Sequence, residues 1–451
     1  MKTIQALARY LPDKCGGIQV NLSELVTKLQ LQGIKIKIAA AKNGSKNEET
    51  YSYEGVEVYR YPVFPGAKRQ PNHGQFPHSG FEYFANWLSN EKADIYHQHH
   101  FESTCGLPHL RLAKKLGLKT VVTIHYPLPI CQRTTLMLNG QQPCDGKIDT
   151  VRCSYCTDNL TRRLPTSMVK LLAAMPMPII SRVKLPESAY IPSSADNGSI
   201  GAIVRPFVVP AFVAARSNSL LEMAKVADRI IAVCDWLYEA LLINGIPKEK
   251  IVLSRCGISA SAHDAIPQIK QYGEPLKVVF LGRWDRLKGL DILVEAVKNL
   301  PPEISIELAI HGIAQDEGYR QKIIELIGND RRIRIAERLT REELPKKLAN
   351  YDLLAVPSQW LETGPLVVLE AHALSLPVIG SNLGGISELV RHGIDGWLVN
   401  SHNDPKVWTE ALALLASDTN LLNTLRQGIQ PVRSVSMQAG DVASIYEKIL
   451  M

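Results

Sequence analysis

The chain has 451 residues, which is too long for one compact core and predicts two domains. Hydrophobic residues make up 45% and charged residues 21% of the chain, as in globular soluble proteins. The formal net charge of +7 suits anionic substrates, but the basic residues are dispersed, so we expect no nucleic-acid partner. We find neither a signal-peptide pattern nor a run of roughly 20 apolar residues, so we expect a cytoplasmic location.

The first half of the chain alternates short apolar strands with helical segments. We expect strands at residues 3–8, 35–40, 56–61, 94–99 and 119–124. This alternation predicts a parallel sheet in a Rossmann-like domain. After the first strand, Gly16 and Gly17 open a helix, and glycines there let a ligand approach the backbone. The alternative for this pair is an ordinary tight turn between strand and helix.

Histidines lie near the ends of two of these strands. His97, His99 and His100 fall in one run, but alternate strand residues point to opposite faces, so only His97 and His99 share a side. A metal site is the weaker interpretation of this run. His125 directly follows the strand at 119–124, at an edge where parallel sheets bind ligands. An imidazole there can hydrogen-bond a ligand hydroxyl without acting as general base, the alternative being a loop histidine whose hydrogen bonds are satisfied within the protein.

A cysteine-bearing insertion follows His125, and we expect it to span about 131–220. Four of the chain's eight cysteines lie there with the spacing C-x12-C-x8-C-x2-C, namely Cys131, Cys144, Cys153 and Cys156. This spacing allows a structural zinc or iron–sulfur site, and equally allows free or redox-active thiols, because it is not a standard zinc-ribbon pattern. Apolar runs at 171–180 and 203–213 are broken by prolines. They predict either a buried core under the insertion or a surface for a lipid-linked acceptor or a membrane.

Regular alternation resumes with a strand expected at 227–233 and a helix from Trp236, which end the first domain. After a polar linker at 259–274, strands are expected at 276–282, 304–310, 332–335 and 352–356. Arg283 and Lys288 flank the turn after the first of these strands. The stretch 360–371 turns sharply after the last one, so Glu362 lies in a loop and Glu370 inside the following helix. Helix N-termini at such an edge attract anions, and a carboxylate can accept hydrogen bonds from paired hydroxyls. We therefore expect a nucleotide diphosphate to bind here.

These two stretches resemble the donor site of retaining glycosyltransferases of the GT-B fold. In that family a Gly-Arg-(four residues)-Lys-Gly stretch holds the donor diphosphate and a Glu-(seven residues)-Glu stretch holds the sugar and the ribose, and both spacings occur here. The residues that the resemblance implies are, for the donor, Gly16, Gly17, Arg283, Lys288, Gly364, Leu366, Val367 and Glu370, and, for catalysis at the sugar, His125 and Glu362. One departure is Pro365, which lacks an N–H where the family often has a Gly-Phe-Gly segment.

The resemblance also implies the architecture, an α/β chain of two Rossmann-like domains facing across a cleft. We expect an N-terminal acceptor domain at 1–257, a nucleotide-sugar donor domain at 258–435 and a C-terminal helix at 436–451 that returns to the first domain. Some members of the family carry a similar cysteine-bearing insertion.

The implied function is transfer of a hexose from a nucleotide-diphosphate sugar, with UDP-glucose as the expected donor, to a glycan or lipid-linked glycan. No Asp-x-Asp suited to a diphosphate-bound metal occurs, so we expect metal-independent catalysis and no required cofactor. The alternatives are a nucleotide-sugar epimerase of related fold and a non-catalytic nucleotide-sugar or glycan binder. A lipid-linked acceptor would add peripheral contact with the inner membrane face.

Overall fold

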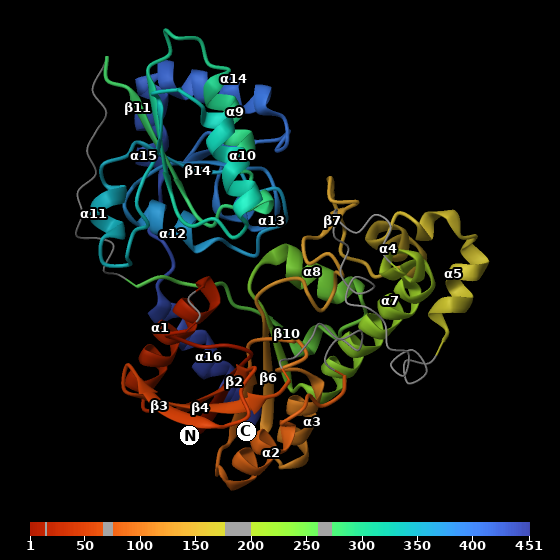
Figure 1. The fold of residues 1–451 in the computed structure, drawn as a ribbon. Helices are drawn as coiled ribbons and strands as arrows, with labels where there is room; N and C mark the ends of the chain where they lie inside the picture. Colours follow the sequence, from red (N-terminus) through yellow and green to blue (C-terminus); the bar gives the residue numbers. More distant parts are fainter. Residues whose placement is uncertain (14–15, 66–74, 176–199, 260–272) are drawn as a thin grey trace. The chain divides into compact units, whose positions relative to one another are not determined.

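The computed structural model describes residues 1–13, 16–65, 75–175, 200–259 and 273–451. The chain forms two compact units (Figure 1). Unit 1 contains Met1–Arg255 and Gln438–Met451, and unit 2 contains Cys256–Met437.

Unit 1 is built on one sheet with the strand order β10-β9-β6-β5-β1-β2-β4-β3. All neighbouring strands are parallel except β3, which pairs antiparallel with β4. The strands are β1 (Lys2–Leu7), β2 (Lys35–Asn43), β3 (Glu49–Tyr53), β4 (Val56–Val63), β5 (Ile95–Gln98), β6 (Lys119–Ile124), β9 (Arg229–Ala232) and β10 (Ile251–Leu253). Because β1 pairs with β2 on one side and β5 on the other, the strand order reverses beside β1, where such sheets bind ligands.

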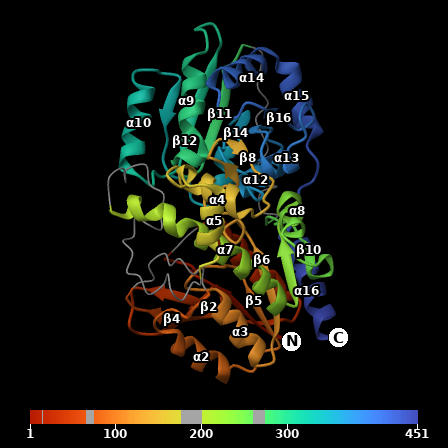
Figure 2. The same cartoon turned by 90° about the vertical axis from the view of Figure 1, so that its right-hand side faces the viewer.

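Helices cover this sheet on both faces. They are α1 (Gly17–Leu31), α2 (Phe81–Asn90), α3 (Leu107–Lys115), α4 (Thr150–Thr157), α5 (Thr166–Ala173), α7 (Ile200–Val226), α8 (Asp235–Ile243) and α16 (Val435–Leu450). Figure 2 shows α2 and α3 together on one side of the strands, which they contact. On the opposite face, α1 and α16 share a core with β1 and β2, in which Leu22, Ile38 and Tyr446 are fully or almost fully buried. A short hairpin of β7 (Met137–Leu138) and β8 (Gln142–Pro143) stands apart from the main sheet.

Helix α7 differs from the proline-broken segment expected from the sequence. It runs over 27 residues and contains both Pro206 and Pro210. Val209, Phe212 and other side chains of α7 are buried, and α7 packs along α3, α4 and α5. Burial of this face compensates for the backbone hydrogen bonds that the prolines remove. In the described part of the chain, no helix has the length and apolar character needed to cross a bilayer. The second half of the expected run at 171–180 lies outside the described residues, and its first residues belong to the end of α5.

Unit 2 has a fully parallel sheet with the order β13-β12-β11-β14-β15-β16. The strands are β11 (Leu276–Leu281), β12 (Ile306–His311), β13 (Ile333–Ile335), β14 (Leu353–Val356), β15 (Val378–Ser381) and β16 (Gly396–Val399). The helices are α9 (Leu290–Lys298), α10 (Glu317–Ile327), α11 (Leu344–Leu348), α12 (Leu366–Ala373), α13 (Gly384–Leu389), α14 (Pro405–Ser417) and α15 (Thr419–Gly428).

Both faces of the unit 2 sheet are buried, which explains its continuous apolar strands. Val278 and Phe280 of β11 face a core formed with α9, α10, α14 and α15. Val279, between them, faces a second core formed with α11, α12 and α13. The expected α/β class with two Rossmann-like units is thus confirmed.

Candidate functional site

The loops after β11 and β14 lie side by side because these two strands are neighbours at the reversal of strand order in unit 2. The backbone N–H of Gln359 donates to the carbonyl of Leu287 at 2.7 Å and ties one loop to the other. Gly289 ends the first loop with φ = 65°, and a Cβ there would lie 1.9 Å from the carbonyl oxygen of Pro357. Only glycine allows the two loops to approach so closely.

Lys288 and Glu362 meet across these loops. The Nζ of Lys288 lies 2.6 Å from Oε1 of Glu362, and the same oxygen accepts hydrogen bonds from Ser358 Oγ at 2.8 Å and Trp360 Nε1 at 3.0 Å. Glu362 is only 5% exposed. Since a buried carboxyl group needs partners, these three donors hold the Glu362 side chain in one orientation.

Arg283 adds a second cation to the loop after β11. Its side chain is 57% exposed and contacts Oδ2 of Asp285 at 3.4 Å. Asp285 in turn accepts hydrogen bonds from the backbone N–H groups of Leu287 and Lys288 and caps the 3-10 turn Arg286–Lys288. Because exposed ion pairs are weak, the guanidinium can exchange this contact for an anionic ligand.

Helix α12 starts at Leu366, directly after the loop that carries Glu362. Pro365 is its N-cap residue and provides no side-chain cap, so the N–H groups of Leu366 and Val367 point from the first turn toward the loop. Gly364 has φ = 107°. A Cβ on Gly385 would lie only 2.4 Å from the backbone nitrogen of Gly364. The loop thus packs directly on the glycines that begin α13, which fixes the start of α12.

Glu370 lies on α12 and is partly buried. Burial raises the pKa of its carboxyl group, and the nearby Arg341 lowers it in part. Among the described residues, Glu370 has no hydrogen-bond or ion-pair partner. A carboxylate placed in this way can accept hydrogen bonds from ligand hydroxyls.

In unit 1, Gly16 and Gly17 lie beyond the carboxyl end of β1 and begin α1. Both are exposed, and α1 has no side-chain cap. A Cβ on Gly16 would lie 2.9 Å from Oε1 of Gln19. Earlier in the chain, Asp13 and the carbonyl of Leu11 contact Arg60 at 2.5 Å and 3.3 Å. The backbone at the start of α1 is therefore open to a ligand.

His125 follows β6 in unit 1 and is 9% exposed. Its Nε2 lies 3.1 Å from Nδ1 of His99, which follows the neighbouring strand β5. Burial lowers the pKa of His125 to about 3, so its imidazole is neutral at physiological pH. His97 and His99 do share a side of the sheet, with ring centroids 4.2 Å apart.

The structure therefore groups Arg283, Lys288, Glu362 and the start of α12 in unit 2, and places His125 and the two glycines at strand ends of unit 1. The roles of Ser358, Trp360 and His99 as hydrogen-bond partners were not predicted. Ser358 and Trp360 precede Glu362 by four and two positions, and His99 directly follows a strand, as His125 does.

The cysteine loop forms a separate feature of unit 1. Cys131, Cys144, Cys153 and Cys156 are free thiols that line one small pocket together with Arg133, Lys147 and Arg152. Burial raises the pKa of Cys153 to about 11. In the described part of the chain, no three His, Cys, Asp or Glu side chains are arranged to hold a metal ion. The zinc or iron–sulfur site stays a prediction.

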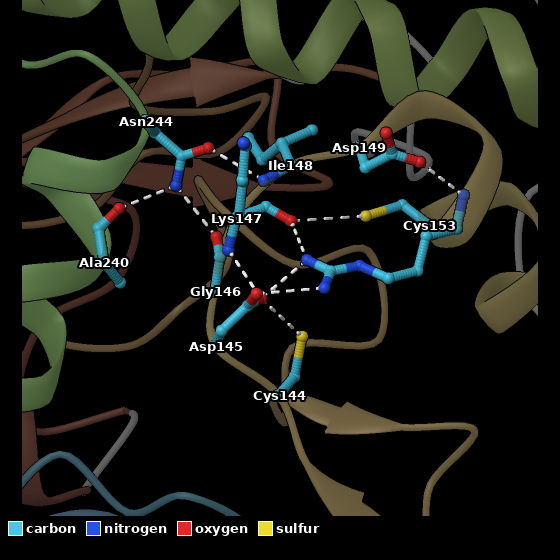
Figure 3. Close-up of polar contacts among 10 residues, drawn as sticks. Cys144, Asp145, Gly146, Lys147, Ile148, Asp149, Cys153, Ala240 and Asn244 are labelled. Carbon is cyan, nitrogen blue, oxygen red and sulfur yellow. Dashed lines mark hydrogen bonds and ion pairs between the residues drawn. The ribbon is translucent and has the colours of Figure 1, made fainter.

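Polar contacts hold this loop in place (Figure 3). Asp145 pairs with Arg152 at 2.6 Å. The Asn244 side chain, at the end of α8, accepts from the N–H of Ile148 at 2.8 Å and donates to the carbonyls of Gly146 at 2.8 Å and Ala240 at 2.6 Å. Asn244 thereby fastens the middle of the cysteine loop to α8.

Known families match both units. Residues 15–147 match Glycosyltransferase Family 4, and residues 263–430 match Glycosyl transferases group 1. The fold is that of HepE from Anabaena, with a TM-score of 0.62 and 14% identity over 99% of this chain and 100% of that chain. Sucrose-phosphate synthase from Thermosynechococcus elongatus has the same fold, with a TM-score of 0.65 and 16% identity over 99% of this chain and 98% of that chain. The chain belongs to the group 1 glycosyltransferases of the GT-B fold. Arg283, Lys288 and Glu362, in the loops after β11 and β14, lie inside the region 263–430 that matches this family.

Curated relatives of this group 1 glycosyltransferase match over part of their length. A D-inositol 3-phosphate glycosyltransferase from Corynebacterium efficiens is 33% identical over 193 residues, which is 40% of this chain and 45% of that protein. A putative colanic acid biosynthesis glycosyltransferase from Escherichia coli is 28% identical over 202 residues, 43% of this chain and 49% of that protein. The chain thus spans about half the length of these two relatives.

Proposed function

We propose that this glycosyltransferase moves a hexose from a nucleotide-diphosphate sugar to a glycan or lipid-linked glycan, with retention of configuration at the anomeric carbon. The observation that carries the proposal is the Lys288–Glu362 pair, 2.6 Å apart, beside the N-terminus of α12. It combines a cation for the diphosphate with a fixed carboxylate for the sugar.

Protein charges can stabilise the leaving diphosphate without a metal ion. Lys288 and Arg283 supply positive charge, and the N–H groups of Leu366 and Val367 add the positive end of a helix dipole. In unit 1, the backbone at Gly16 and Gly17 offers a further contact to the diphosphate. Glu370 accepts hydrogen bonds from the ribose hydroxyls.

The proposed reaction is a front-face displacement. The bond between the anomeric carbon and the phosphate oxygen breaks, and its electron pair stays on the diphosphate. The acceptor hydroxyl attacks from the same face, and its proton passes to that phosphate oxygen. Glu362 orients the sugar hydroxyls, and the neutral His125 accepts a hydrogen bond from the sugar.

UDP-glucose is the proposed donor. HepE, which shares the fold, has been solved with UDP-glucose and with UDP and glucose. For the acceptor, apolar side chains stand exposed on two packed helices of unit 1, Met168 and Leu171 on α5 and Ile203 and Phe207 on α7. Lys170, between Met168 and Leu171 in the sequence, is also exposed. This surface supports a lipid-linked acceptor and peripheral membrane contact.

The test is calorimetric binding of UDP, GDP and ADP in EDTA, followed by NMR of donor and product. We expect UDP to bind without metal, Glu370→Ala to weaken this binding about tenfold, and the product to keep the donor's anomeric configuration. Conversion of the donor sugar in the absence of any acceptor would instead identify an epimerase. Binding without turnover for glycan and lipid-linked acceptors would identify a binder.

A further inference from the structure

A chain of buried hydrogen bonds links His125 to the C-terminal helix. Nδ1 of His99 lies 3.1 Å from Nε2 of His125, and Nε2 of His99 lies 2.8 Å from Oε1 of Gln5. Gln5 is on β1, His99 follows β5 and His125 follows β6, and these strands are neighbours in the sheet. Gln5 and His99 are 0% and 2% exposed, so water does not compete for these bonds.

The amide of Gln5 gives this chain a direction. In the structure its Nε2 lies 2.9 Å from Thr3 Oγ1 and 3.0 Å from the hydroxyl of Tyr446, both of which can accept, and its carbonyl oxygen lies toward His99. A carbonyl oxygen only accepts, so Nε2 of His99 carries that ring's proton and Nδ1 accepts. Nε2 of His125 must then donate to His99. A neutral imidazole has one N–H, so Nδ1 of His125 is the unprotonated nitrogen.

Tyr446 completes the network from α16. Its hydroxyl accepts from Gln5 and lies 2.6 Å from Nδ1 of His97, to which it donates. Nε2 of His97 then donates to Thr123 Oγ1 at 2.7 Å. Burial lowers the pKa of His97 to about 3 and that of His99 well below its usual value, so every ring in the chain is neutral. The ring N–H of each of the three histidines and the Tyr446 hydroxyl then have one acceptor each in this arrangement.

We propose that Gln5, His99 and Tyr446 are positioning residues that fix His125 as the tautomer with Nε2 protonated and Nδ1 as its acceptor atom. The inference rests on the proposed function, in which His125 accepts a hydrogen bond from the transferred sugar. The other tautomer would turn that acceptor into a donor and mismatch the sugar hydroxyl. The last helix of the chain thereby contributes to the geometry of the active site, although Tyr446 itself touches no substrate.

The test is a long-range ¹H–¹⁵N correlation spectrum of the full-length protein labelled with ¹⁵N-histidine. The His125 signal is identified by its loss in His125→Gln. We expect Nε2 to be protonated and Nδ1 unprotonated in the wild type. Tyr446→Phe and Gln5→Met should populate the second tautomer and lower kcat about tenfold, with little change in donor KM.

Tyr96→Phe is the matched control. Tyr96 is a buried tyrosine of the same sheet, as fully enclosed as Tyr446, and its hydroxyl contacts Gln98 rather than the His125 network. We expect its spectrum and kcat to remain those of the wild type. A wild-type His125 protonated on Nδ1 would overturn the inference, as would Tyr446→Phe and Gln5→Met spectra with an unchanged tautomer.

The spectrum separates this inference from the proposed function. If either variant fails to fold, the wild-type tautomer still decides the assignment. If the spectrum shows the expected His125 tautomer but the protein transfers no sugar, the hydrogen-bond network is upheld and the proposed function is rejected. Sugar transfer by a protein whose His125 carries its proton on Nδ1 would uphold the function and reject the network.

Discussion

Lys288 and Glu362 are 74 positions apart in the chain, and the ammonium group of one lies 2.6 Å from the carboxylate of the other. The pair forms because β11 and β14 are neighbours that both end at the same edge of the unit 2 sheet. Lys288 balances a buried carboxylate and also leaves a cation at the place proposed for the donor diphosphate. We therefore expect donor binding to depend on the local stability of this loop.

Replacement of Lys288 should weaken nucleotide binding. We expect Lys288→Met to cost about 2 kcal/mol, or roughly 30-fold in the Kd of UDP measured by calorimetry. The control is Lys322→Met, which removes the same charge from an exposed pair with Asp291 elsewhere in unit 2. Equal UDP affinity in the two variants would show that Lys288 does not contact the diphosphate.

Trp360 should matter for turnover more than for nucleotide binding. Trp360→Phe keeps an aromatic ring but removes the N–H that donates to Glu362 at 3.0 Å. We expect a stability loss of about 1 kcal/mol, a roughly fivefold lower kcat and a nearly unchanged Kd for UDP. Trp397→Phe, at a ring that packs on His392, is the control. Steady-state kinetics that do not distinguish the two variants would exclude orientation of Glu362 by the indole.

Glu370 should make donor binding depend on pH. Because burial raises the pKa of its carboxyl group, the carboxylate is lost as pH falls through a value above the ordinary range. Donor affinity should therefore decline in mildly acidic buffer, and Glu370→Gln should remove this decline while lowering affinity about tenfold at pH 7.5. A calorimetric titration series from pH 7.5 to acid is the measurement. An unchanged pH profile in the variant would assign the decline to another group.

The raised pKa of Glu370 affects the stability of the fold in the opposite direction to donor affinity. A raised folded-state pKa favours the protonated form, so this contribution to stability is present at low pH and is lost as pH rises through the folded pKa. We expect Glu370→Gln to raise Tm at pH 7.5 and to leave Tm nearly unchanged in acid, as measured by calorimetric melting. A lower Tm at pH 7.5 would mean that Glu370 has a stabilising partner.

Asn244 should control the order of the cysteine loop. Asn244→Ala removes three hydrogen bonds that fasten this loop to α8 and should destabilise it by about 2 kcal/mol. We expect faster cleavage near Lys147 in limited trypsin digestion. Asn350→Ala, which removes contacts of an exposed amide with the end of α11 in unit 2, should not change cleavage there. Identical digestion of both variants would contradict the anchoring role of Asn244.

The sequence alone determined the layered α/β architecture, because strand and helix periodicity depends on residues close together in the chain. The strand expected at 119–124 is β6 over the same residues, and the placement of Glu362 in a loop and Glu370 in a helix is as expected. The common side of His97 and His99 also followed from the two-residue strand period.

Tertiary structure decided the features that depend on contacts between distant segments. Packing against α3, α4 and α5 makes α7 helical through two prolines, against their local preference. Strand order brings Lys288 to Glu362, and the position of α16 brings Tyr446 to His97 across 349 positions. Local sequence cannot specify such pairs, because a hydrogen bond between distant residues depends on how the elements pack and not on the propensity of either segment.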